Sequence, residues 1–170
     1  MLRGLMMALL LVTAVLAQTA LFPFLALGGL RPDLLLLVVV GVALSDGVMP
    51  GLRVGFAAGL LTDLLVDQAP VGLAALVFTG VGYVIGTARP YLAPDSLTAP
   101  LLLAFLASLL GTAGYGLLSL LLGDERVTGQ MLLSAAASVA IYNTLLAPVV
   151  LGVVRRLSDR FPLEPGGLMR

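Results

Sequence analysis

The sequence contains no cysteine, no histidine and no tryptophan, and arginine is its only basic residue type. The absence of cysteine and histidine excludes disulfides, thiol nucleophiles, imidazole bases and nearly every zinc or haem site. Nine arginines balance nine acidic residues, so no excess of charge indicates a nucleic-acid partner. No metal or cofactor is expected, and only carboxylate, hydroxyl and amide groups are left for chemistry.

Hydrophobic residues are abundant. They make up 60% of the 170 residues, whereas charged residues make up 11%, and the mean hydropathy is +1.13. This composition is far more apolar than that of a soluble domain, and it predicts an all-α integral membrane protein. Breaks that contain glycine, proline or both divide the chain into six predicted membrane helices, at residues 4–22, 31–44, 51–66, 73–88, 97–122 and 131–154.

The second predicted helix is short. After Asp33 its apolar run has only 11 residues, whereas a membrane span needs roughly 20. This segment can span only if Pro32 and Asp33 lie at membrane depth, and a re-entrant segment is the alternative. The connections between the six segments leave no room for a soluble domain. We therefore expect one transmembrane domain at residues 1–155 and a short cytoplasmic tail at residues 156–170.

The arginines indicate the orientation, because short cytoplasmic loops of membrane proteins retain positive charge. With six spans and a cytoplasmic N-terminus, seven arginines lie inside and only Arg31 and Arg126 lie outside. Both termini are then cytoplasmic. The first residues also resemble a cleavable signal, with Arg3 before an apolar core and Ala17 after it. We favour a retained helix, because the apolar run continues to Phe22.

Small and acidic residues recur every fourth position in the third predicted helix. The row consists of Gly51, Gly55, Gly59, Asp63 and Asp67. Glycines four apart allow the backbones of two membrane helices to approach closely, so this face is predicted to pack against a helix of this chain or of a partner. Candidate surfaces within the chain are Gly82 with Gly86, and Ala107 with Gly111.

The carboxylates of this row need a polar environment, because an acidic side chain is costly inside a membrane. By the predicted topology Asp63 and Asp67 lie toward the outer side, near an outer polar cluster of Arg31, Pro32 and Asp33. The structural interpretation is that Pro32 and Asp33 begin a helix, while Asp63 caps a neighbouring helix or pairs with Arg31. The functional alternative is a polar pocket or docking site that is open to the outside.

Two further sets of polar residues are interpreted as packing elements. Tyr142 and Asn143 lie near the middle of the sixth predicted helix, before a kink that Pro148 is expected to cause. Ser108, Thr112 and Tyr115 are expected to supply hydrogen bonds between helices. No nucleophile, phosphate-binding loop or pair of acid and base carboxylates is evident, so an enzyme is not expected.

Four segments in this order and spacing resemble the rod shape-determining MreD family. They read RPDLLLL at residues 31–37, GLRVGFAAGLLTDLL at 51–65, APVGLAAL at 69–76 and VGYVIG at 81–86. The family pattern has a Pro-Asp pair before a leucine run, a glycine-rich helix that ends in aspartate, and a Pro-x-Gly turn. These features match Pro32 and Asp33, then Gly55, Gly59 and Asp63, then Pro70 and Gly72.

The resemblance implies a non-enzymatic component of the bacterial inner membrane that helps to position peptidoglycan synthesis for rod-shape maintenance. It implies binding to the membrane helix and juxtamembrane region of the scaffold protein MreC, through the glycine row or the outer polar cluster. MreB, RodA with its transpeptidase partner, and membrane lipid are further candidate partners.

The family is also similar in fold to the six-helix substrate-binding subunits of energy-coupling-factor transporters. The alternative function is therefore capture of a vitamin among Asp33, Asp63, Tyr83 and Tyr91.

Overall fold

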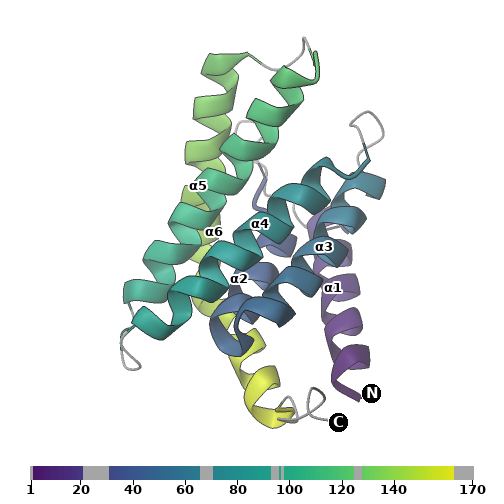
Figure 1. The fold of residues 1–170 in the computed structure, drawn as a ribbon, viewed down its shortest axis with the longest axis vertical. Helices are drawn as coiled ribbons and strands as arrows, with labels where there is room; N and C mark the ends of the chain where they lie inside the picture. Colours follow the sequence, from purple (N-terminus) through teal and green to yellow (C-terminus); the bar gives the residue numbers. More distant parts are fainter. Residues whose placement is uncertain are drawn as a thin grey trace.

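The computed structural model describes residues 2–20, 31–65, 71–92, 96, 98–124 and 128–162. These residues form six α helices and one short 3-10 turn (Figure 1). The helices are α1 (Leu2–Ala20), α2 (Leu34–Asp46), α3 (Val48–Leu65), α4 (Leu73–Ala88), α5 (Thr98–Leu121) and α6 (Gly129–Arg160), and the turn η1 (Arg89–Tyr91) follows α4. All except α2 are long and apolar enough to cross a membrane, which confirms the expected all-α membrane fold.

The helix bounds agree closely with the predicted segments, with two informative differences. α3 begins at Val48, because Pro50 lies in the first turn, where its missing N–H costs no helical hydrogen bond. Gly47 alone then separates α2 from α3, with a positive φ of 90° that favours glycine. α6 continues to Arg160, so the predicted domain boundary after residue 155 falls inside a helix.

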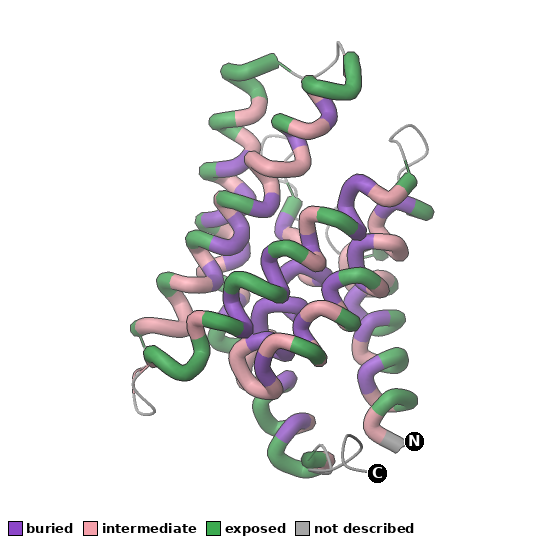
Figure 2. Tube along the Cα trace, in the orientation of Figure 1, coloured by how far each residue is buried: buried purple, intermediate pink, exposed green. Residues whose placement is uncertain are grey.

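The short helix α2 is the centre of the bundle. It packs against every other α helix, and all its residues from Leu35 to Ala43 are buried. A helix that is apolar on all sides is expected in such a position, because it has no polar face to present to solvent. α3 packs most extensively on α4, and α5 on α6. Exposed residues lie along the outer sides of the surrounding helices (Figure 2).

The helices alternate in direction, which gives the bundle two distinct ends (Figure 1). We call the end that holds the start of α1 and the end of α6 the Arg3 end, and the end that holds the starts of α2 and α4 the Arg31 end. α1 packs into the bundle through Met7, Leu11 and Ala14.

Candidate functional site

The glycine row of α3 faces α4 at very short range. A Cβ atom added at Gly51 would lie 2.9 Å from the carbonyl oxygen of Gly82, and one at Gly55 would lie 2.5 Å from that of Phe78. At Gly59 it would collide with the backbone of Ala74 and Ala75. These obstacles are backbone atoms, which cannot move aside as a side chain can. The geometry therefore favours the helix-packing alternative for this row.

α4 supplies glycines of its own to the same contact. A Cβ atom at Gly86 would lie 2.7 Å from Cα of Val48, and one at Gly82 would collide with the Gly51 backbone. Gly82 and Gly86 are thus the surface that receives α3. Gly111 of α5, the other surface considered, approaches Leu36 of α2.

Asp63 lies on the same face of α3 as the glycine row, and its side chain caps the N-terminus of α4. Its carboxylate accepts hydrogen bonds from the backbone N–H groups of Gly72, Ala74 and Ala75, at 2.9, 2.9 and 3.1 Å. The first N–H groups of a helix have no partner within the helix, and a carboxylate also interacts favourably with the helix dipole. Because of these hydrogen bonds, Asp63 acts as a cap on a neighbouring helix. The residue is only 3% exposed.

The predicted turn before α4 is described at Gly72. This residue has a positive φ of 105°, a conformation that glycine adopts without steric cost, and the turn directs its N–H to Asp63. Pro70 and Asp67 lie outside the described residues.

The outer polar cluster is divided between the interior and the surface. Pro32 is buried, whereas Arg31 is exposed and has no ion pair within the described part of the chain. Asp33 is the N-cap of α2, and its Oδ1 accepts from the N–H of Leu36 at 3.0 Å. No hydrogen bond among the described residues joins Asp33 or Arg31 to Asp63.

The start of α2 lies inside the bundle, where side chains of α1 and α6 form hydrogen bonds with its first backbone groups. Asn143, near the middle of α6, accepts from the N–H of Asp33 at 2.8 Å and donates to the Asp33 carbonyl at 3.3 Å and to Ser108 Oγ at 2.8 Å. Gln18 of α1 accepts from the N–H of Leu34 at 3.1 Å. Pro32 is therefore buried and Asp33 half-buried, and α1 and α6 enclose the start of α2.

We expect Asn143→Leu to lower the free energy of unfolding by about 2 kcal/mol, because it removes three hydrogen bonds that average about 0.6 kcal/mol each inside a membrane protein. Ser108→Ala removes the partner of only one of them and should cost about a third as much. Denaturant unfolding in detergent measures both. A leucine variant as stable as the parent chain would contradict this role of Asn143.

A second polar cluster, which the sequence analysis did not single out, joins three helices at the Arg3 end. Arg3 of α1 forms an ion pair with Asp46 at the end of α2 and donates to the backbone carbonyl of Phe161 after α6. Ser158 Oγ donates to Asp46 at 3.2 Å. A carboxylate at a helix C-terminus interacts unfavourably with the helix dipole, so a nearby cation stabilises it. The position of Asp46 just after the predicted end of an apolar helix could therefore have indicated an arginine partner.

Each of these polar groups serves the bundle itself. Every buried side-chain nitrogen or oxygen in the described residues has a hydrogen-bond partner, and no group of acidic side chains that could hold a metal occurs among them. Among the described carboxylates, Asp33, Asp46 and Asp63 accept hydrogen bonds from other groups of the chain. The arrangement is suited to a rigid bundle.

A family model described as rod shape-determining protein MreD matches residues 1–157. No curated protein and no solved structure matches, so the fold resemblance to transporter subunits stays a prediction. The match takes in almost all of the helical bundle. Together with five helices that can cross a membrane, it identifies a multi-pass membrane protein.

Proposed function

Because the chain belongs to the MreD family of rod shape-determining proteins, we propose that it is a non-enzymatic inner-membrane component of the rod-shape machinery. In this function it binds the membrane-anchored scaffold protein MreC and helps to position peptidoglycan synthesis. The observation that carries the proposal is the family match over residues 1–157. The bundle agrees with a structural role, because its buried polar groups are engaged in holding its own helices together.

We place the MreC contact on α1, because the glycine row is already covered by α4. α1 is the least buried of the candidate spans. Its outward side carries the exposed Gly4 and Ala8, which are four residues apart, and a Cβ added at Gly4 would meet no atom within 4 Å. Small residues with this spacing admit a second helix. Exposed apolar side chains flank them at Leu5, Leu9, Val12 and Leu16.

The test is co-purification of the tagged full-length chain with its cognate MreC in mild detergent, with subunits counted by native mass spectrometry. We expect a stable complex, and we expect Ala8→Leu to reduce the recovered MreC at least fivefold, because the larger side chain keeps the two helices apart. Gly80→Leu is the matched control, since Gly80 is exposed on α4 and also has open space around it.

The outcomes separate the contact from the function. If the parent chain recovers MreC and Ala8→Leu recovers the same amount, the assignment to α1 is wrong while the partnership holds. If the parent chain recovers no MreC when both proteins are present in the membrane, the proposed function is wrong.

A further inference from the structure

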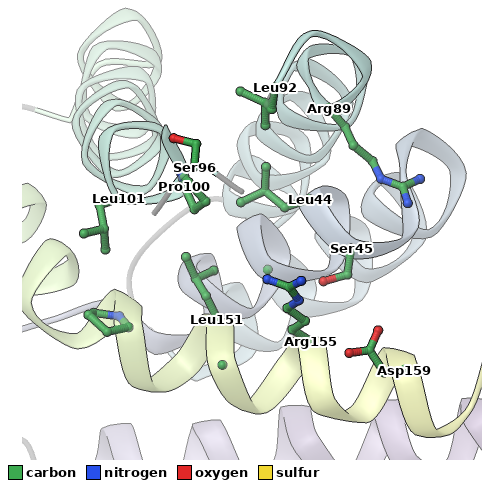
Figure 3. A pocket seen from close by; sticks show the side chains of 13 residues that line it. Leu44, Ser45, Arg89, Leu92, Ser96, Pro100, Leu101, Leu151, Arg155 and Asp159 are labelled. Carbon is green, nitrogen blue, oxygen red and sulfur yellow. The ribbon is translucent and has the colours of Figure 1, made fainter. Parts of the chain in front are cut away.

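A cleft of about 780 Å³ opens at the Arg3 end (Figure 3). Its lining includes Ser45 and Asp159, which are sequence neighbours of Asp46 and Ser158 in the polar cluster of that end. α2, α5, α6 and the segment after α4 all contribute to its wall. Its volume is within the range of about 300–1,000 Å³ that is usual for ligand pockets. The cleft is therefore large enough for a ligand.

The wall of the cleft is mostly apolar, and its charged side chains lie on one side of it. Pro100 and Leu101 line it from α5, and Figure 3 shows them across the cleft from the Arg155 side chain. Arg155 of α6 lies beside Ser45 of α2, and Arg89 lies beyond Ser45. This separation matches an amphipathic molecule that has an anionic head and an apolar body.

The two guanidinium groups are available to a ligand. Neither Arg89 nor Arg155 has an ion pair within the described part of the chain, and both residues are exposed. The Arg89 guanidinium lies near the end of α2, since its Nη1 is 3.4 Å from the position that a Cβ on Gly47 would take. Asp159 is the one acidic residue of the wall, so its charged groups sum to a single positive charge. One phosphodiester would balance that charge.

We infer that this cleft binds the phosphodiester headgroup of an anionic glycerophospholipid such as phosphatidylglycerol. Arg89 and Arg155 attract the phosphate, and Ser45, which lies between them in Figure 3, is placed for a glycerol hydroxyl. The acyl chains lie against Pro100 and Leu101 and continue over the exposed apolar side chains of Val149 and Leu102. Basic pockets between membrane helices are known to hold anionic headgroups.

Arginines also collect at this end simply because short cytoplasmic loops retain positive charge. The inference requires more than this general effect. The two arginines of the cleft must contribute more to the affinity for phosphatidylglycerol than other exposed arginines do. Arg53 and Arg156 provide the comparison, because both are exposed near the same end and neither lines the cleft.

The experiment measures lipid binding to the full chain by native mass spectrometry, with phosphatidylglycerol and zwitterionic phosphatidylcholine as probes. We expect phosphatidylglycerol to bind at least tenfold more tightly. Each arginine near an anionic headgroup is worth about a fivefold change in affinity, so Arg89→Gln with Arg155→Gln should weaken phosphatidylglycerol binding by about 25-fold. Arg53→Gln with Arg156→Gln should change it less than twofold.

A second variant tests the cleft without changing any charge. Gly152 lines the cleft, and a Cβ added there would meet no atom within 4 Å. Gly152→Leu should therefore place a side chain inside the cleft and weaken phosphatidylglycerol binding at least tenfold, while the melting temperature does not fall. Gly80→Leu, in open space outside the cleft, is the control.

Several results would overturn the inference. Equal affinity for the two lipids, or equal losses in the two arginine pairs, would mean that only general surface charge attracts lipid. Displacement of the lipid by soluble glycerol phosphate at equal concentration would mean that the acyl chains add nothing. Lipid binding that survives Gly152→Leu but is displaced by MreC would assign the cleft to a protein segment.

Discussion

Asp63→Ala is expected to lower the free energy of unfolding by about 4 kcal/mol, because it leaves three backbone N–H groups at the start of α4 without partners, two of them on buried residues. An unpaired buried donor loses its hydrogen bond and stays out of contact with water. Inside a membrane protein, water cannot easily replace the lost acceptor. The measurement is denaturant unfolding of the detergent-solubilised chain, followed by circular dichroism.

Two further substitutions distinguish the effect of the Asp63 cap on stability from the effect of removing a negative charge. Asp63→Asn keeps one acceptor oxygen and should cost about half as much as Asp63→Ala, since part of the cap survives. Asp159→Asn removes a carboxylate from an exposed position and should change stability by less than about 0.5 kcal/mol. Equal stabilities for Asp63→Ala and Asp159→Asn would show that the cap does not stabilise the bundle.

Gly59→Ala is expected to destabilise the chain by about 3 kcal/mol, near the upper end of the usual cost of overpacking. The added methyl group would collide with the backbone of Ala74 and Ala75, so α3 and α4 must separate to admit it. That separation weakens the most extensive helix contact of the bundle. The separation also moves Asp63 away from the N–H groups that it caps. The loss of helix packing and the loss of the cap are therefore coupled.

The control for this prediction is Gly80→Ala in the partner helix. Gly80 is exposed, and a Cβ there would meet no atom within 4 Å, so alanine should stabilise the chain by up to about 1 kcal/mol through its higher helix propensity. The same unfolding experiment compares the two variants. If both alanines stabilised the chain, the close approach of α3 and α4 would be disproved.

Local patterns were sufficient for much of the fold. The six apolar segments and their breaks depend on residue type and spacing alone, and so does the prediction that glycines four apart mark a close helix contact. Asp33 as a helix cap follows from the apolar run that begins immediately after it. The family resemblance also came from local segments, and the match over residues 1–157 confirms it.

The sequence by itself determined that this is a membrane-embedded helical bundle, because hydrophobic composition and the spacing of small residues are properties of single segments. Which residues meet across the bundle was decided only by the tertiary structure, because those contacts join positions far apart in the chain. Asn143 binds Asp33 across 110 residues, and Arg3 reaches Phe161 across 158. The depth of α2 likewise depends on all the helices that surround it, and the cleft at the Arg3 end exists only where four separate segments come together.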